Sequence, residues 1–412
     1  MDTKKLSALQ LIELENKFGA HNYHPLPVAL EKGEGVYVWD VNGKKYYDFL
    51  SAYSAINQGH CHPKIINTLI EQAKKLTLTS RAFFNDRLGI YEKFITGYFE
   101  YEKVLPMNTG AEAVETALKL CRKWAYEKKG LKENSAQIVV CEGNFHGRTT
   151  TIVSFSIDPD AYKNYGPFTP GFIVIPYNNA DALEKVLSEN SNIAGFLVEP
   201  IQGEAGAYVP DDGYLKKCYD VCKQHDVLFI ADEVQTGIAR TGKLLACDYE
   251  NVHPDILILG KALSGGTYPV SAVLADNYIM DVIHPGQHGS TFGGNPIAAS
   301  VAITALNVIK DEKLSENAFR LGNIFRQQLE ELCKQSSIAS FVRGKGLLNA
   351  LIINNEGDKD MAWEVCVRLS ENGLLAKPTH TNIIRFAPPL IITEEQLLEC
   401  IDIIKRTINE NF

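Results

Sequence analysis

The chain of 412 residues contains no apolar run that approaches the roughly 20 residues needed to cross a membrane. It also lacks an excess of basic residues, because 41 lysines and arginines stand against 50 aspartates and glutamates and the formal net charge is −9. A protein that binds nucleic acid would need a basic face. The sequence therefore predicts a protein that has neither a membrane nor a nucleic acid as its partner.

Cysteine pairs with CxxC spacing are absent as well, although the chain has nine cysteines. Cys218 and Cys222 are spaced i, i+4 on a helical pattern, and we expect them to pack in a core rather than to bind metal or form a redox pair. His60 and His62 resemble half of a metal site, but nothing nearby supplies a third ligand. No metal is predicted.

The first residues lack both an apolar signal core and an Arg- and Ser-rich transit composition. Scattered thiols without paired spacing are typical of a reducing compartment. From these two observations we expect a cytoplasmic protein.

Apolar runs rich in β-formers alternate with helical stretches from about residue 100 to 300. Near-continuous apolar strands separated by helices are typical of a parallel sheet covered on both faces. The runs are QIVVC (137–141), GFIVIP (171–176), AGFLVEP (194–200), VLFIAD (227–232) and DILILGK (255–261). The sequence therefore predicts an α/β fold whose large domain holds a mostly parallel sheet.

Three segments are predicted along the chain. Residues 1–53 contain a β-hairpin around Asn42-Gly43, a dipeptide typical of two-residue hairpin turns. Residues 54–300 form the large domain. Residues 301–412 combine long amphipathic helices with short strands, and we expect the hairpin to join them in a smaller α+β domain.

The run ILILGKALSGG, residues 256–266, ends four aliphatic residues on a glycine and Lys261. The lysine either marks the exposed end of a strand or is kept partly desolvated, so that its neutral amine can attack a carbonyl. Ligands of an open parallel sheet bind outside the carboxyl ends of its strands. Glu199, Asp232 and Lys261 each stand at such an end, so the three could share one site.

Asp232 ends a buried strand, where a carboxylate is costly unless it meets a cation or several donors. It either caps the following helix or holds a protonated pyridine nitrogen. A carboxylate on that nitrogen keeps the ring electron-deficient, as pyridoxal phosphate requires.

Two stretches are candidates for binding a phosphate. Thr109 and Glu112 have capping-box spacing before a helical pattern, and Gly110 and Ala111 offer little-obstructed N–H groups at that helix start. The alternative is simply a well-capped helix. In HGSTFGGNP, the hydroxyls of Ser290–Thr291 precede a Gly-Gly turn and could reach the same phosphate.

The stretch GNFHGRT, residues 143–149, holds an aromatic ring and an arginine. Phe145 is suited to stacking on a flat ring, although a lone Phe usually packs in a core. Arg148 is either a surface residue or, near a site, a bidentate clamp for a carboxylate. His146 is expected to be structural or to line the site as a donor.

The motifs ADEVQTG and LGKALSGG, with NTGAEA and GSTFGGNP, resemble the class III aminotransferases of the pyridoxal-phosphate fold-type I group. Within that class, GAHNYHPLPVAL, FLSAYSAINQGHCHPKI, LTSRAFFND, EPIQGEAG and RGKGLLNALI are similar to the ornithine aminotransferases. The resemblance runs from about residue 19 to the C-terminus.

This resemblance implies the cofactor pyridoxal 5'-phosphate and a set of residues around it. The cofactor residues would be Lys261 as covalent anchor, Asp232 at the pyridine nitrogen, Gln235 at the ring hydroxyl, Phe145 on the ring, and Gly110 and Ala111 at the phosphate. It also implies a homodimer with shared active sites, in which Ser290 and Thr291 reach the phosphate of the partner's cofactor. The substrate contacts would be Tyr23, Tyr53, Arg148, Glu204 and Arg385. His146 stands where animal members of the family commonly have tryptophan.

The expected reaction moves the terminal amine of L-ornithine to 2-oxoglutarate and leaves glutamate 5-semialdehyde and glutamate. An acetylornithine or 4-aminobutyrate aminotransferase is the nearest alternative, against which Tyr23 and Tyr53 argue, since their hydroxyls suit a free α-amino acid end. A racemase or aminomutase on the same scaffold would need no external keto acid. A binding protein without activity would gain nothing from an amine at the position of Lys261.

Overall fold

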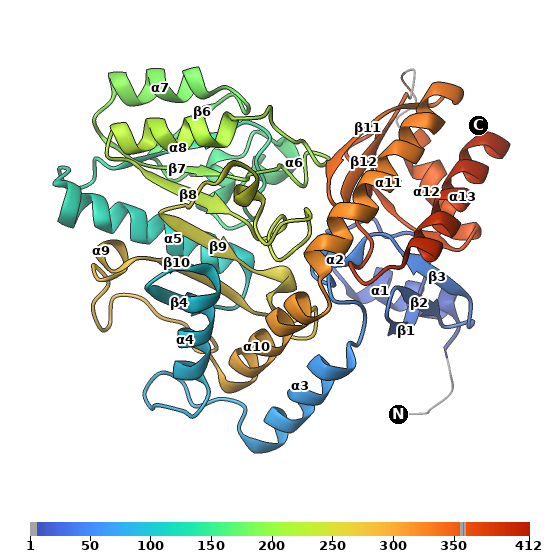
Figure 1. Cartoon of the computed structure of the whole chain (residues 1–412), viewed down its shortest axis with the longest axis horizontal. Helices are drawn as coiled ribbons and strands as arrows, with labels where there is room; N and C mark the ends of the chain where they lie inside the picture. The colour runs from blue at the N-terminus through green and yellow to red at the C-terminus, as the bar shows by residue number, and fades with distance from the viewer. Residues whose placement is uncertain (1–5, 355–356, 358–359) are drawn as a thin grey trace.

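A seven-stranded sheet forms the centre of the larger of two lobes in the computed structural model, which describes residues 6–354, 357 and 360–412 (Figure 1). Its strands lie in the order β4 (Lys103–Met107), β10 (Ser271–Ala275), β9 (Ile256–Leu259), β8 (Leu228–Asp232), β7 (Ile193–Val198), β5 (Gln137–Cys141) and β6 (Phe172–Ile175). The strands from β9 to β6 are parallel, and β10 is antiparallel to both of its neighbours. The predicted α/β fold with a mostly parallel sheet is confirmed, and all five predicted apolar runs contain a strand.

Helices cover both faces of this sheet, as its fully buried strands require. Alternate residues of β5 separate the two layers: Ile138 and Val140 pack with α5 (Gly110–Trp124) and α9 (Asn277–Met280), whereas Val139 and Cys141 pack with α7 (Ala180–Glu189) and α8 (Tyr214–Gln224). The cysteines of α8 are buried free thiols in the second layer, which confirms that they pack.

Further helices cover the β4 and β10 edge and extend toward the smaller lobe. The long helix α10 (Pro296–Asp311) packs on α3 (Pro63–Lys75) and α4 (Leu88–Phe99). Short helical turns complete the lobe: η1 (Ala125–Lys129), η2 (Ile152–Phe155), α6 (Pro159–Tyr162) and η3 (Ala246–Glu250).

Two four-stranded sheets build the smaller lobe. One is antiparallel, in the order β11 (Ala339–Lys345), β12 (Leu348–Ile353), β15 (Ile383–Phe386) and β14 (Lys377–Thr379). The other holds β1 (Leu30–Glu34), β2 (Tyr37–Asp40), β3 (Lys45–Asp48) and β13 (Leu374–Leu375). β2 and β3 form the hairpin around Asn42-Gly43, and β3 pairs in parallel with β13. Segments far apart in the sequence thus share one sheet. The predicted division of the chain at residues 53 and 300 stays a prediction. Residues 1–5 of the first predicted segment lie outside the described residues.

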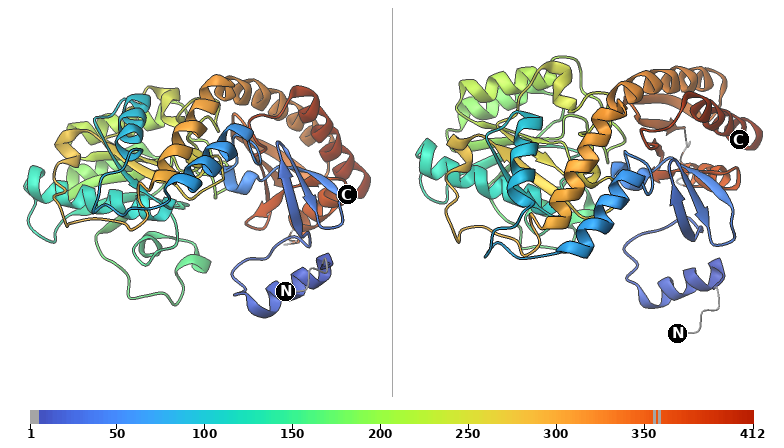
Figure 2. Two further views of the ribbon diagram at one scale, coloured as in Figure 1. Left: turned by 90° about the horizontal axis from the view of Figure 1, so that it is seen from below. Right: turned by 60° about the horizontal axis from the view of Figure 1, so that its bottom comes forward.

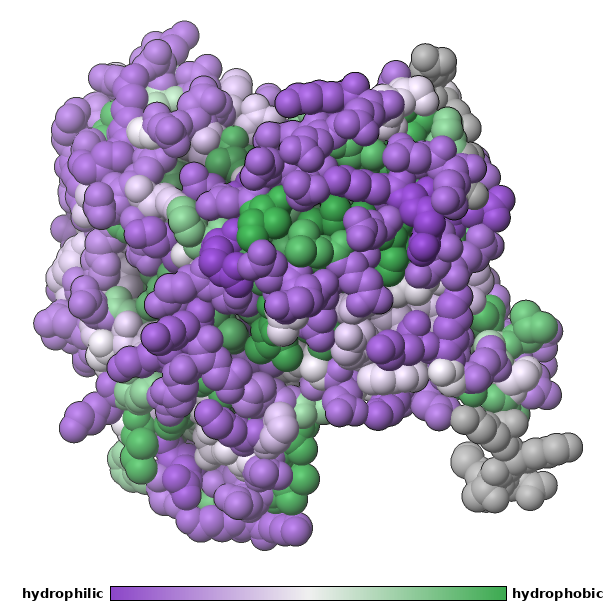
Figure 3. Space-filling view, turned by 45° about the vertical axis from the view of Figure 1, so that its right-hand side comes forward, coloured by the Kyte–Doolittle hydropathy of each residue, from purple (hydrophilic) through white to green (hydrophobic). Residues whose placement is uncertain are grey.

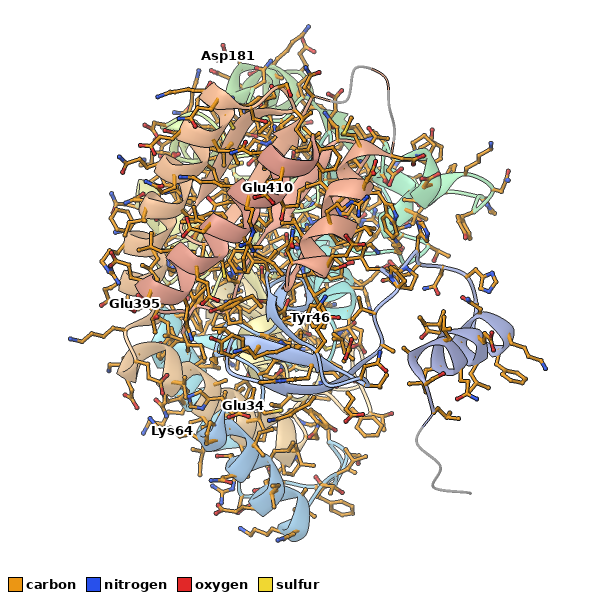
Figure 4. The ribbon with its side chains drawn as sticks, turned by 90° about the vertical axis from the view of Figure 1, so that its right-hand side faces the viewer. Glu34, Tyr46, Lys64, Asp181, Glu395 and Glu410 are labelled. Atoms are coloured by element: carbon orange, nitrogen blue, oxygen red, sulfur yellow. The ribbon has the colours of Figure 1, made fainter. Side chains whose placement is uncertain are left out.

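Helices α11 (Leu314–Gln335), α12 (Met361–Glu371) and α13 (Glu394–Asn411) pack on these sheets. Figure 4 shows Tyr46 of the hairpin and Glu34 of the neighbouring strand β1 below the helix that carries Glu395 and Glu410. The Tyr47 hydroxyl of the hairpin donates to the Glu399 carboxylate of α13 at 2.5 Å. The N-terminal hairpin is therefore tied to the C-terminal helix.

The N-terminal helix α1 (Ala8–Phe18) has no buried residue and projects from the body of the molecule (Figure 2). The face shown in Figure 3 is mostly hydrophilic around a central apolar patch. Among the helices of the described residues, none has the length and apolar character that a membrane crossing requires.

Candidate active site

Three neighbouring parallel strands deliver Glu199, Asp232 and Lys261 to one place. Glu199 follows β7, Asp232 ends β8, and Lys261 follows β9, and these strands are adjacent in the sheet. All three side chains line a cavity of about 200 Å³. Gly110, Ala111, Phe145, His146, Glu204 and Gln235 line it as well.

Lys261 begins the short turn η4 (Lys261–Ser264) with a left-handed backbone, φ +45°. A non-glycine residue rarely adopts this conformation unless its surroundings enforce it, and such residues cluster at functional sites. Burial, together with the positive charge of Arg385, lowers the pKa of the Lys261 amine to about 8. The structure therefore places a partly neutral amine in a cavity, not a lysine at the exposed end of a strand.

Asp232 lies at the end of β8 and is 5% exposed. Its Oδ1 accepts from the Val234 N–H at 3.0 Å, and its Oδ2 lies 2.7 Å from Nδ1 of the buried His146. Burial disfavours the charged imidazole, but the hydrogen bond and the charge of Asp232 outweigh it, so the pKa of His146 is raised. Each carboxylate oxygen has two lone pairs, so Asp232 keeps the capacity to accept from a bound group.

Glu199 fixes the two loops that flank the cavity. Its carboxylate accepts from the N–H of Phe145 at 2.8 Å and from the N–H of Gly203 at 3.2 Å. Burial raises the pKa of Glu199 to about 7. Its backbone contacts make it a support for the cavity wall.

The helix start predicted to bind phosphate forms one end of the cavity. The capping box is confirmed: the Thr109 hydroxyl accepts from the Glu112 N–H at 3.2 Å, and the Glu112 carboxylate accepts from the Thr109 N–H at 2.8 Å. Gly147 adopts φ +125°, and a Cβ there would lie 2.9 Å from the Cβ of Ala111. A loop thus packs closely against the first turn of α5, where N–H groups and the helix dipole favour an anion.

Ser290 and Thr291 do not line this cavity. The Ser290 hydroxyl accepts from the Asn108 side-chain amide at 2.8 Å and from the Gly293 N–H at 3.1 Å. Thr291 is exposed. Their contact with the cofactor of a partner subunit stays a prediction.

Phe145 and Gln235 come from different sequence motifs, GNFHGRT and ADEVQTG, but line the same cavity. The Phe145 ring is 36% exposed, and the guanidinium of the exposed Arg148 lies 5.8 Å from its centroid. Gln235 is buried against the backbone of Gly203, where a Cβ would come within 1.7 Å of its Oε1. A flat ring could reach the Phe145 face, whereas Arg148 stays open to solvent.

The small lobe contributes a buried cation. Arg385, on β15, is 2% exposed, and its Nη1 donates to Glu204 Oε2 at 2.9 Å and to the Gly203 carbonyl at 3.0 Å. Burial alone would raise the pKa of Glu204, but the charge and the hydrogen bond of Arg385 lower it overall. The Thr379 hydroxyl donates to Glu204 Oε1 at 3.1 Å. Glu204 is therefore held as a carboxylate on top of the arginine.

Tyr53 belongs to a turn that winds in the left-handed sense. The four residues of α2 (Ser51–Ser54) have φ values of 47°, 47°, 60° and 74°. The Asp48 carboxylate accepts from the N–H groups of Leu50 and Ser51 at 2.9 and 2.8 Å, which supports the start of the turn. The turn places the Tyr53 ring 5.0 Å from the Arg385 guanidinium.

Tyr23 lies in the exposed N-terminal segment and shares a second, more open groove of about 480 Å³ with Tyr53 and Lys377. The Lys377 ammonium lies 5.8 Å from the Tyr23 ring centroid. The next residue, His24, stacks on Trp363 of α12 with centroids 4.1 Å apart. This stack ties the segment that carries Tyr23 to the small lobe.

The sequence analysis expected His146 to be structural or to line the site, and it does line the cavity, but its contact with Asp232 was not predicted. Thr379 and Lys377 were given no role. His146 could have been predicted as a partner of Asp232, since His146 follows the end of one parallel strand and Asp232 ends another, and such ends meet at one edge of the sheet. Thr379 and Lys377 had no comparable pattern, because their positions depend on the pairing of β14 with β15.

The residues of this cavity fit pyridoxal phosphate. A helix start suits its phosphate, a buried carboxylate suits a protonated pyridine nitrogen, an aromatic face suits the flat ring, and a lysine with a lowered pKa suits an aldehyde. The set Gly110, Ala111, Phe145, Asp232 and Lys261 supplies these four features within one cavity.

Comparison with known proteins places the chain in a class. Residues 18–408 match the model of the aminotransferase class-III family. The chain belongs to this family, whose members depend on pyridoxal phosphate.

Individual relatives are similar over nearly the whole chain. A protein of Drosophila melanogaster named mitochondrial ornithine aminotransferase is 62% identical over 96% of this chain and 90% of its own length. A structure of the ornithine aminotransferase from Toxoplasma gondii, described with partial occupancy of pyridoxal phosphate, has a TM-score of 0.97 and 48% identity, covering 99% and 95% of the two chains. A structure named acetylornithine aminotransferase, from Elizabethkingia anophelis, has a TM-score of 0.91 and 64% identity, covering 98% and 100%.

The predicted cytoplasmic location is wrong by this comparison. Several relatives, from fly, rat and rice, are named as mitochondrial enzymes. The prediction failed because targeting signals in general lie outside the folded domain, so the composition of the folded domain does not indicate its compartment.

Proposed function

We propose that this protein is an ornithine δ-aminotransferase that works by a ping-pong mechanism with pyridoxal phosphate. It takes the terminal amine of L-ornithine, releasing glutamate 5-semialdehyde, and gives the amine to 2-oxoglutarate, releasing glutamate. The observation that carries the proposal is the partly buried Glu204–Arg385 pair, with 2.9 Å between Oε2 and Nη1, beside the cavity of Lys261. The names of the fly and Toxoplasma relatives support it.

The large lobe would hold the cofactor. Lys261 binds it covalently, Asp232 holds the positive charge on the ring nitrogen, and the first turn of α5 binds the phosphate. Phe145 covers the ring, and Gln235 lies at the ring hydroxyl. When bound, the cofactor supplies an electron-withdrawing ring that stabilises negative charge at the substrate carbon.

Lys261 also moves the proton. Its Nζ would act as the general base that takes the proton from the substrate carbon and as the general acid that gives it back later in the half-reaction. A pKa of about 8 suits this task, because roughly a tenth of the amine is then neutral at pH 7, far more than for an ordinary lysine.

Glu204 and Arg385 let one site accept two substrates of different shape. Ornithine must present its δ-amine, so an uncovered arginine beside the cofactor would attract its α-carboxylate and misplace it. Glu204 covers Arg385 during this half-reaction. 2-Oxoglutarate presents its keto carbon beside a carboxylate, which Arg385 binds once Glu204 has moved away. Arg148 binds the distal carboxylate in both, and Tyr23 and Tyr53 contact the α-amino acid end of ornithine.

We propose further that the protein is a homodimer with shared active sites. Phe83, Phe84 and Phe292 are exposed apolar side chains, and α1 has no buried residue. Ser290 and Thr291 would reach the phosphate of the partner's cofactor. Light scattering after size-exclusion chromatography tests the dimer: a monomer at micromolar concentration would contradict it.

One assay tests the activity. Purified holoenzyme is incubated with ornithine and 2-oxoglutarate, and the semialdehyde is measured through its cyclised pyrroline. The 64% identical structure named acetylornithine aminotransferase makes N-acetylornithine the necessary parallel substrate. A preference for N-acetylornithine or 4-aminobutyrate would overturn the proposal, and turnover without any keto acid would indicate a racemase or aminomutase.

A further inference from the structure

Lys377 stands directly across from Arg385 in the small-lobe sheet. β14 and β15 are antiparallel, and their register pairs Lys377 with Arg385 and Thr379 with Ile383. Cross-strand partners lie on the same face with Cβ atoms roughly 5 Å apart, and residues two apart on one strand share that face. Lys377, Thr379 and Arg385 therefore point to the same side of the sheet.

Glu204 lies over this face. Its Oε2 accepts from Arg385 at 2.9 Å, and its Oε1 accepts from Thr379 at 3.1 Å. Lys377 lies two residues before Thr379 on β14, and its side chain is on the same face of the strand. Burial lowers the pKa of the Lys377 amine, and the negative charge of Glu204 acts in the opposite direction, as expected for two groups within electrostatic reach.

The Lys377 ammonium has no ion pair among the residues that the structure describes; its contact is the Tyr23 ring, 5.8 Å away. It lines the groove that holds Tyr23 and Tyr53. A half-buried lysine without a carboxylate in direct contact recovers only part of its desolvation cost, here from the more distant charge of Glu204. An intermittent partner would explain why a cation occupies this position.

The switch described above leaves Glu204 in need of a cation. When the α-carboxylate of the keto acid takes Arg385, two carboxylates would compete for one guanidinium, and like charges in a partly buried site repel strongly. We propose that Lys377 is the alternate partner of Glu204: Arg385 holds the carboxylate while ornithine is bound, and Lys377 holds it while the keto acid occupies Arg385. Lys377 is thus a positioning residue that acts through Glu204, and this role rests on the proposed function.

Ligand binding to the holoenzyme, measured without a keto acid so that no repeated turnover occurs, tests the role. Isothermal titration calorimetry compares glutarate, a dicarboxylate that engages Arg385, with 5-aminovalerate, which carries a terminal amine and one carboxylate. Lys377→Met is expected to weaken glutarate about tenfold and to leave 5-aminovalerate within about twofold. Lys377→Arg, which keeps the charge, should restore glutarate affinity to within about threefold. Lys345→Met is the matched control, because this lysine of β11 lies over the Tyr249 ring, outside both cavities.

A double-mutant cycle separates this role from simple attraction of anions. In a Glu204→Gln background the side chain at position 204 has no carboxylate with which Lys377 could pair. Lys377→Met should then change glutarate affinity by less than about twofold. An equal loss in both backgrounds, an equal loss for both ligands, or no loss at all overturns the role of Lys377. If wild-type protein transfers no amine from ornithine to 2-oxoglutarate, the proposed function fails instead, and this inference fails with it.

Discussion

The two walls of the active-site cavity are built on different principles. The large-lobe wall consists of side chains at the ends of parallel strands, Glu199, Asp232 and Lys261, each fixed by the sheet behind it. What we call the small-lobe wall stands behind the cavity lining: Arg385, from the antiparallel sheet, contacts Glu204 of that lining, and Tyr53, from a left-handed turn, lies 5.0 Å from the Arg385 guanidinium. The large-lobe wall suits the steps that both half-reactions share. The small-lobe wall suits discrimination between the two substrates, because Arg385 can exchange its contact with Glu204 for one with a substrate carboxylate. The predictions below test this division.

The largest effect should come from the amine of the large-lobe wall. Lys261→Ala should lower kcat by at least about 10³-fold, because it removes both the covalent anchor and the proton carrier. Borohydride reduction followed by peptide mass spectrometry should find the cofactor on Lys261 in wild-type protein and nowhere in the variant. Normal turnover by Lys261→Ala would refute the assignment, and Lys345→Ala serves as the control.

Asp232→Asn should keep the fold but lose the charge that faces the ring nitrogen. One such electrostatic contact is worth about 3–4 kcal/mol, so single-turnover rates should fall on the order of 10²- to 10³-fold. Asp255, a buried aspartate paired with Lys223 at the other end of β9, provides the comparison. Asp255→Asn should lower the melting temperature with little change in rate. The turn that follows β8 is not a helix, so the helix-cap alternative is wrong, and an unchanged rate in Asp232→Asn would leave Asp232 only its structural contacts with the Val234 N–H and His146.

Changes to the small-lobe wall should affect the two half-reactions differently. Arg385→Ala should spare the ornithine half-reaction and weaken the 2-oxoglutarate half by tenfold or more. The α-carboxylate of the keto acid then loses its guanidinium partner, and truncating one partner of a hydrogen-bonded charge pair costs roughly 2–5 kcal/mol. Glu204→Ala should lose the preference for the δ-amine and gain α-amine transfer. Stopped-flow spectroscopy of each half-reaction measures both. Equal losses in both halves for both variants would reduce the pair to a structural ion bridge.

The two walls are coupled through the pKa of Lys261. With a pKa of about 8, the amine of the cofactor-free protein is protonated below pH 8 and nucleophilic above it. The rate of cofactor rebinding should therefore rise about tenfold per pH unit up to pH 8 and then level off, whereas an ordinary lysine would keep rising to about pH 10.4. Arg385→Ala removes one cause of the lowering, so its inflection should move to higher pH. An inflection that stays near 10 in wild-type protein would contradict the burial of this amine.

The smallest effect concerns the left-handed turn. Ala52 is exposed with φ +47°, a conformation that costs an L-residue about 1–2 kcal/mol and glycine much less. Ala52→Gly should therefore leave the free energy of unfolding unchanged or raise it by up to about 1 kcal/mol, after the entropic cost of glycine. Chemical denaturation measures this. A clear loss of stability would show that the turn is not strained at this position.

Much of the large lobe could be predicted from the sequence. The run QIVVC became β5 with the same boundaries, and the Thr109–Glu112 capping box formed as its spacing indicated. The apolar runs gave no direction for each strand, so the antiparallel β10 went unpredicted; its direction depends on the two neighbours to which it bonds. Likewise, no propensity of Ser51, Ala52, Tyr53 and Ser54 favours a left-handed turn, which the surrounding structure enforces.

The sequence by itself determined which chemical groups stand at the strand ends, because apolar runs that stop at Asp232 and Lys261 meet at one sheet edge whenever the sheet is parallel. The tertiary structure alone decided what those groups touch. The His146–Asp232 contact, the Arg385–Glu204 pair and the placement of Lys377 across from Arg385 join residues separated by long stretches of chain. Local periodicity encodes burial and strand ends, whereas strand register and domain packing are set by the summed fit of many distant side chains, which no single motif contains.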